Sequence, residues 1–257
     1  MTLAKSTGGY WTCTFDDEFN GTTLDTTKWS AITTASTGYH SGQECFVNSP
    51  NNVSVANGLL SLTVRREAAP FVCTDPFGNY TTQYTSGSVM TYGKFSQAYG
   101  RFEVRAAFPA ATVTGLQSSL WLYPVSANKY GPWPTSGEID IAEEYSSYPD
   151  RAIPYVHYTP ASTDLNVTNN YCLITNVSAL HDYVVEWTTS TIKISYDGTT
   201  CITDNWNPAS PLAKPQPFDQ PFFINLTQAL GIGSNPFNAA TTPLPATTQV
   251  DYVRVWS

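Results

Sequence analysis

Three acidic residues lie close together in a segment that has the alternation of a β-strand. Within residues 133–145, Glu138 and Asp140 alternate with Ile139 and Ile141. Successive side chains of a strand point to opposite faces, so the two acids would share one face and the two isoleucines the other. Because the isoleucines favour a hydrophobic core, we expect the acids to face outward.

A third acid joins this face if the strand contains one extra residue. Placed at Ala142, that residue would form a β-bulge and return Glu143 to the side of Glu138 and Asp140. A strand without the bulge would instead put Glu144 on the acidic face. We expect the bulged register, which sets three carboxyl groups in a row.

A row of carboxyl groups suits the cleavage of glycosidic bonds. Like charges raise one another's pKa, so the groups do not all ionise together. In a retaining glycosidase one carboxylate attacks the anomeric carbon while a second, protonated carboxyl delivers a proton to the leaving oxygen. The alternative is a solvated edge strand whose acids only prevent aggregation. The flanking Trp133-Pro134 and Gly137, with the offset of the third acid, favour the catalytic interpretation.

Short alternating segments separated by turn signals make up most of the chain. Strands of this kind without a sustained helical stripe predict an all-β sandwich or barrel. One domain over residues 1–257 is the simplest organisation, with residues 1–9 as a flexible N-terminal segment and the Pro-rich residues 205–221 as a surface loop. The predicted strands are residues 53–55, 60–64, 101–105, 184–187, 192–196 and 250–256, and the predicted turns are residues 56–58, 75–78 and 196–198.

The charge balance excludes some classes of partner. The chain has 12 Lys and Arg residues against 20 Asp and Glu residues, a formal net charge of −8. Nucleic acids and sulfated polysaccharides are polyanions that need clustered basic residues, so neither is an expected partner, whereas a neutral polymer is indifferent to this charge. A run of about 18 apolar residues does not occur, so no membrane-spanning segment is predicted. Residues 1–9 lack the apolar stretch of a signal peptide, so the chain is either cytosolic or begins after a removed signal.

The cysteines are scattered and lack the spacing of a zinc site. This pattern favours an oxidising compartment with one or two disulfides and one thiol left over. We expect the pairs Cys172–Cys201 and Cys45–Cys73, although connectivity does not follow from sequence and buried free thiols are the alternative. The five are Cys13, Cys45, Cys73, Cys172 and Cys201.

Several segments resemble those of one enzyme family. Residues 138–143, Glu-Ile-Asp-Ile-Ala-Glu, resemble the Glu-x-Asp-x-x-Glu signature of glycoside hydrolase family 16 in its bulged, laminarinase-like form. Weaker similarities extend over nearly the whole chain, at residues 15–29, 99–105, 181–187, 196–198 and 250–255. The resemblance implies an all-β fold, a concanavalin A-like β-sandwich jelly roll of two curved antiparallel sheets, with the catalytic strand on the concave face.

The resemblance also implies a role for each acid. Carried over by position, Glu138 would be the nucleophile, Glu143 the acid/base, and Asp140 the residue that assists the nucleophile. Trp133 would stack on a sugar ring beside the cleavage point, because an exposed aromatic face suits such stacking. Ordinary core packing is the alternative for Trp133.

Further substrate contacts follow from the same resemblance. Arg101, Asn48 and His157 would hydrogen-bond sugar hydroxyls, and Trp121 and Gln228 lie in segments that line the family's cleft. A purely structural role is the alternative for His157. We assign only structural roles to the remaining two histidines, His40 and His181.

A structural calcium ion is a further implication, although catalysis itself would need no cofactor. The matching positions are Glu18, the backbone of Gly58, and Asp251, whose oxygens would join the two chain ends around a hard cation. A surface carboxylate pair without metal is the alternative.

Two departures from the family pattern bear on activity. Gln117 stands where laminarinase-like members usually have an aromatic, and Thr159-Pro160 follows His157-Tyr158 where the family has two glycines. The sequence predicts a secreted, monomeric, retaining endo-hydrolase of β-1,3-glucan whose partner is a neutral β-glucan polysaccharide. The alternatives are a glucan-binding relative with weak or no turnover, and a hydrolase of another neutral polymer such as agarose or mixed-linkage glucan.

Overall fold

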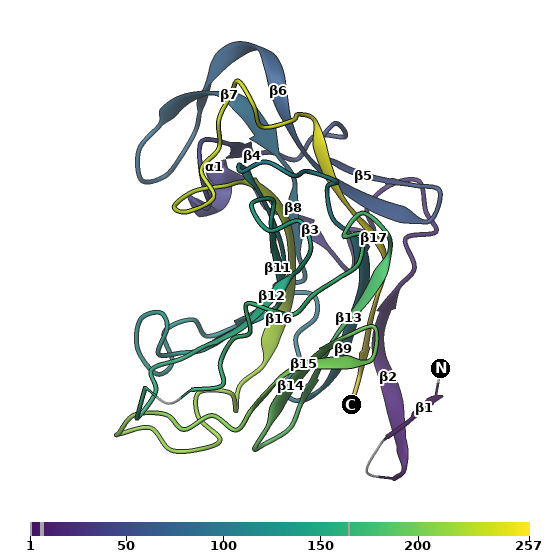
Figure 1. The fold of residues 1–257 in the computed structure, drawn as a ribbon, viewed down its shortest axis with the longest axis vertical. Coiled ribbons are helices and arrows are strands. Elements are labelled where there is room, and N and C mark those ends of the chain that lie inside the picture. Colours follow the sequence, from purple (N-terminus) through teal and green to yellow (C-terminus); the bar gives the residue numbers. More distant parts are fainter. Residues whose placement is uncertain (1, 6–7, 164) are drawn as a thin grey trace.

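Two β-sheets packed face to face form this computed structural model, which describes residues 2–5, 8–163 and 165–257 (Figure 1). Neighbouring strands are antiparallel except for the short β4–β7 pair. The larger sheet has the order β15-β14-β13-β9-β17-β6-β7-β4 with β1, β2 and β5 attached, and the smaller has the order β12-β11-β10-β16-β8-β3. The expected jelly-roll class of fold is confirmed, and the one helix of the described residues is α1, Thr34–Thr37.

The strands of the larger sheet are β1 Thr2–Ala4, β2 Tyr10–Asp17, β4 Cys45–Phe46, β5 Val53–Ala56, β6 Leu59–Cys73, β7 Tyr80–Ser86, β9 Gly100–Ala107, β13 His181–Trp187, β14 Ile192–Tyr196, β15 Thr199–Asp204 and β17 Ala246–Trp256. Those of the smaller sheet are β3 Ser30–Ala31, β8 Ser88–Met90, β10 Leu116–Pro124, β11 Glu138–Tyr145, β12 Ile153–His157 and β16 Phe222–Leu230.

The core lies between the sheets because each strand turns alternate apolar side chains inward. Phe102 and Val104 of β9 pack in one cluster with Leu120 and Leu122 of β10 and with Ile139 of β11. All five are at most 1 % exposed, so the sandwich excludes water along its middle. Removal of these side chains from water stabilises the fold by about 1.5–3 kcal/mol for each large residue.

Two tight hairpins follow from residues that tolerate a positive φ. Asn57 and Gly58 connect β5 to β6 with φ values of 56° and 77°, and Asp197 and Gly198 connect β14 to β15 with 47° and 79°. A two-residue loop with both φ values positive matches the right-handed twist of the flanking strands. The predicted turns at residues 56–58 and 196–198 are therefore hairpin turns.

Most predicted strands lie within longer observed ones. The sequence pattern did not indicate that β6 continues to Cys73, nor did it indicate β2, β7, β10 and β16. Residues 205–221 lie outside the strands, as expected of a loop. The expectation of a flexible segment over residues 1–9 falls partly on residues 1, 6 and 7, outside the described residues, whereas β1 pairs with β2.

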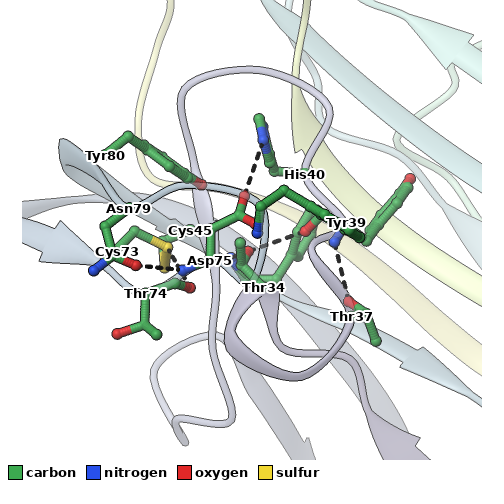
Figure 2. Close-up of polar contacts among 12 residues, drawn as sticks. Thr34, Thr37, Tyr39, His40, Cys45, Cys73, Thr74, Asp75, Asn79 and Tyr80 are labelled. Carbon is green, nitrogen blue, oxygen red and sulfur yellow. Dashed lines mark hydrogen bonds and ion pairs between the residues drawn. A yellow bond between two sulfur atoms is a disulfide. The ribbon is translucent and has the colours of Figure 1, made fainter.

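Both expected disulfides are present, Cys45–Cys73 and Cys172–Cys201, and Cys13 is free. The first joins β4 to the end of β6, beside the pair His40–Asp75, whose Nε2 and Oδ2 atoms are 3.5 Å apart (Figure 2). This bond fastens the segment that carries Tyr39 to the β6–β7 hairpin. Across the described ranges, we find no helix with the length and apolar character needed to cross a bilayer.

Candidate active site

The smaller sheet has an open face, defined here as the face turned away from the larger sheet. The sheets curve so that this face lies on the inside of the bend (Figure 1). Its side chains come from alternate positions of β10, β11 and β12, and many of them are half-buried. They include Gln117, Trp121, Tyr123, Glu138, Glu143, Tyr155 and His157.

A bulge in β11 brings the three acids onto this face. Leu120 of β10 pairs with Ala142 and Trp121 pairs with Asp140, so Ile141 has no residue opposite it. The register with β12 shifts over the same stretch, between Asp140 and Glu143. The predicted bulge is therefore present, with Ile141 rather than Ala142 as the residue unpaired toward β10. Glu144 consequently points into the interior, where it is 0 % exposed.

Glu138 is held by Trp133. The indole Nε1 donates to Glu138 Oε2 at 2.5 Å, and the Trp133 side chain is 56 % exposed, so its ring is available at the surface. Core packing of Trp133 is therefore excluded. Burial, followed by the charge of Asp140, raises the pKa of Glu138 to about 8, while His157 and the indole N–H act in the opposite direction.

Asp140 contacts His157 of the neighbouring strand β12. The His157 Nε2 and Asp140 Oδ2 atoms are 2.9 Å apart. Asp140 is only 3 % exposed, and burial together with Glu143 raises its pKa well above the usual range. Burial lowers the pKa of His157, so its imidazole is neutral near pH 7. Tyr155 stacks on the same imidazole, with ring centroids 3.9 Å apart.

Glu143 has its own pair of donors on β10. Gln117 Nε2 donates to Glu143 Oε1 at 2.8 Å, and Ser119 Oγ donates to the same oxygen at 3.4 Å. The glutamine that replaces an aromatic residue thus contacts the third acid directly. Sequence reasoning missed Ser119, although it alternates with Gln117 and Trp121 and so lies on the same face of β10.

Aromatic residues complete the open face. Trp121 lies opposite Asp140 in the register, and its Nε1 donates to Thr227 Oγ1 at 3.2 Å. Tyr39, from the loop after α1, lies with its ring centroid 6.0 Å from that of Trp121. Burial raises the pKa of Tyr39, and Glu138 and Glu143 add to the effect, so the hydroxyl stays neutral beside the acids. No sequence signal pointed to Tyr39, which lies shortly before the disulfide-bonded Cys45.

Three predicted substrate contacts are not brought to the acids. The prediction for Arg101 is wrong. Its side chain lies on the outer face of the larger sheet, where it pairs with Glu103 and Glu186, because β9 turns its even-numbered residues into the core. The prediction for Gln228 is also wrong, because its side chain lies in the interior between the sheets. There its Oε1 accepts hydrogen bonds from the hydroxyls of Ser118 and Thr248. Asn48 is exposed and lines a separate hollow beside β3, at the far edge of the smaller sheet from β11.

The expected calcium ligands do not form a fitting set. Glu18 accepts two hydrogen bonds from the Arg254 guanidinium, at 2.7 and 2.9 Å. Asp251 faces Arg105, with Oδ2 and Nε 3.5 Å apart. Both carboxylates are therefore engaged by cations, and the described residues contain no cluster of three or more His, Cys, Asp or Glu side chains suited to a metal. The expectation of calcium at Glu18, Gly58 and Asp251 gains no support.

A two-sheet sandwich with crowded carboxyl groups on its open face has the architecture of a glycoside hydrolase. The chain belongs to glycosyl hydrolases family 16, whose family model matches residues 40–241. This assignment confirms the family resemblance of the sequence motifs.

The names of similar proteins indicate several substrate specificities. The chain is 34 % identical over 94 % of its length to glucan endo-1,3-beta-glucosidase A1 of Niallia circulans, and 31 % identical over 94 % to a keratan-sulfate endo-1,4-beta-galactosidase of Sphingobacterium multivorum. It spans 37 % and 54 % of the lengths of these two curated relatives. The solved endo-beta-1,3-glucanase of Pyrococcus furiosus is 28 % identical with a TM-score of 0.81, covering 100 % of this chain and 97 % of that one.

Proposed function

We propose that the chain is a retaining endo-hydrolase of β-1,3-glucan that works by double displacement. The observation that carries this proposal is the placement of Glu138 and Glu143 on one face of β11, each with its own hydrogen-bond donor. Asp140 lies between them and is almost fully buried. Two carboxyl groups on one face are the apparatus that retaining glycosidases use, and no cofactor takes part in that chemistry.

In the first step Glu138 attacks the anomeric carbon while Glu143 gives its proton to the oxygen that leaves with the departing sugar. The bond from the anomeric carbon to that oxygen breaks, and an ester between the sugar and Glu138 forms. In the second step Glu143 takes a proton from water, and the water oxygen displaces Glu138. The product keeps the β configuration because two inversions cancel.

The buried Asp140 decides which group is ionised. Asp140 is more buried than Glu138, and burial together with the charge of Glu143 raises its pKa well above the usual range, so Asp140 holds a proton in addition to the one on Glu143. A neutral Asp140 no longer opposes the ionisation of Glu138, and the Trp133 N–H stabilises the resulting carboxylate. Glu138 is then a nucleophile, and the site avoids three adjacent negative charges.

A neutral glucan is the substrate that the chain's charge and relatives support. The net charge of −8 disfavours a sulfated polymer, and two relatives are named as cutting β-1,3-glucan. The two disulfides support secretion, since such bonds persist in oxidising compartments. A glucan-binding relative without turnover is the second candidate, but the contact of Gln117 with Glu143 favours a working acid over a vestigial one.

A panel of polysaccharides tests the proposal. Purified protein is expected to release oligosaccharides from laminarin, less from mixed-linkage glucan, and none from agarose or carrageenan. Proton NMR of the first products should show the β anomer before mutarotation. Release by Glu138→Gln equal to that of the wild type, or an initial α product, would refute the assigned mechanism.

A further inference from the structure

A hollow of about 430 Å³ lies beside Glu143 at the end of β11. Glu143 lines this hollow and Glu138 does not. Tyr148, Arg151 and Tyr171 are among the other residues that line it. A general acid contacts the oxygen that joins the cut sugar to the leaving group, so a hollow bordered by the acid alone lies on the leaving-group side.

Three of the residues that line the hollow are two tyrosines around one arginine. The Arg151 guanidinium lies 5.5 Å from the ring centroid of Tyr148 and 5.5 Å from that of Tyr171. Tyr148 and Tyr171 are 46 % and 78 % exposed, so each keeps ring surface free. We name these three side chains the tyrosine–arginine wall.

The positive charge of Arg151 is neutralised by an adjacent carboxylate. Arg151 donates Nε and Nη2 to the carboxylate of Asp150 at 2.7 and 2.9 Å, and Nη1 to the carbonyl oxygen of Asn170 at 2.9 Å. A bidentate Arg–carboxylate pair leaves little attraction for a sulfate or another carboxylate. The surface therefore suits the apolar face of an uncharged sugar ring.

A short segment, residues 167–174, carries Tyr171 and is attached to both sheets. On one side Leu173 pairs with Arg151, and Ile174 N donates to Asp150 O at 2.8 Å, next to β12. On the other side the Cys172–Cys201 disulfide joins the segment to β15, and Asn169 Nδ2 donates to Cys201 O at 2.9 Å. β12 and β15 are the edge strands of the two sheets, so this segment spans the sandwich edge.

We infer that the tyrosine–arginine wall binds a neutral sugar of the leaving group and that the Cys172–Cys201 disulfide holds Tyr171 in place for this contact. The inference rests on the proposed function and deepens it. An exposed aromatic ring held from two sides loses little freedom when a sugar stacks on it, so it contributes to recognition at low entropic cost. Tyr171 is accordingly a specificity residue and takes no part in bond cleavage.

Two substrates separate this role from catalysis. When a laminarin hexasaccharide is cut, the leaving group is made of sugars that would occupy the hollow. When the β-fluoride of a laminarin trisaccharide is cut, the leaving group is only a fluoride ion. For Tyr171→Ala, kcat/KM on the hexasaccharide is expected to fall about tenfold, mainly through KM, as for loss of a stacked aromatic contact. The loss on the fluoride is expected to be far smaller. Tyr171→Phe keeps the ring and should recover most of the hexasaccharide activity.

Leu173→Ala is the matched control, because Leu173 is 64 % exposed in the same segment and does not line the hollow. Equal losses on both substrates in Tyr171→Ala, or no loss on either, would overturn the inference. A preference for a leaving group that carries sulfate would overturn its neutral character. If the wild type cleaves neither substrate, the proposed function itself fails, which is a distinct result from equal losses.

Discussion

Glu143 and Glu144 are consecutive residues of β11 whose side chains lie on opposite faces of the smaller sheet. Glu143 meets Gln117 and Ser119 on the open face. Glu144 is 0 % exposed in the interior, and within the described residues neither of its carboxylate oxygens has a hydrogen-bond partner. The bulge at Ile141 decides which of the two lies on the open face.

Activity should therefore distinguish these neighbours. Glu143→Gln removes the proposed proton donor and is expected to lower kcat on laminarin by about a hundredfold or more, the usual contribution of a general acid. Glu144→Gln should keep most of the activity, because the side chain faces away from the hollow and the other acids. Reducing-sugar release at matched protein concentration provides the comparison. The opposite pattern would mean that the register of β11 is shifted by one residue.

Glu144 should also make stability depend on pH. Burial raises its pKa from the ordinary 4.5 to about 8, so between these values the folded chain holds a proton that the unfolded chain has released. Stability from this group is full below pH 4.5 and falls as pH rises toward 8, by up to about 1.4 kcal/mol per unit. Glu144→Gln should remove this slope, and urea unfolding at pH 5, 6, 7 and 8 measures it. An identical slope in the variant and the wild type would contradict the assignment.

Trp133 should tune the ionisation of Glu138. Its indole N–H favours the charged carboxylate, so Trp133→Phe is expected to raise the pKa of Glu138. The acidic limb of the kcat/KM profile should then move upward by about half to one pH unit. Trp133→Ala removes the exposed ring as well and should also raise KM. An acidic limb at the same pH in Trp133→Phe and wild type would mean that this bond does not set the ionisation.

The sequence was informative where a residue pattern has a local cause. The alternation of Glu138 and Asp140 with isoleucines placed both acids on one face, and positive-φ residues such as Asn57-Gly58 marked hairpins. The two-residue alternation of a strand also predicts that Phe102 and Val104 lie in the core. The same reasoning applied to Arg101, which directly precedes Phe102, would have placed it on the outer face, which the family resemblance alone did not reveal.

Features that depend on contacts across the sandwich were not predictable. β16 is buried on both faces, so no alternation showed which side Gln228 would take. Tyr39 contacts Trp121 on the open face from a loop distant in sequence from β10, a contact that no local pattern specifies. The Asp140–His157 contact depends on the pairing of β11 with β12, a register that neither strand specifies by itself.

Two glutamines on neighbouring strands should separate catalysis from stability. Gln117 donates to Glu143 from the open face, whereas Gln228 accepts from Ser118 and Thr248 in the interior. Gln117→Leu removes a donor that orients the acid, so kcat should fall about tenfold while the unfolding free energy changes little. Gln228→Leu removes the acceptor that the buried hydroxyls of Ser118 and Thr248 share and should cost about 1–3 kcal/mol of stability.

Activity of Gln228→Leu per folded molecule should match that of the wild type, because its side chain has no contact with the acids. Urea unfolding and kcat measured on the same preparations give the two quantities independently. A large loss of kcat in Gln228→Leu with an unchanged unfolding free energy would mean that this residue acts at the active site and not in the core. A loss of stability without loss of kcat in Gln117→Leu would remove Gln117 from the orientation of Glu143, and would leave Ser119 as the donor on which that acid depends.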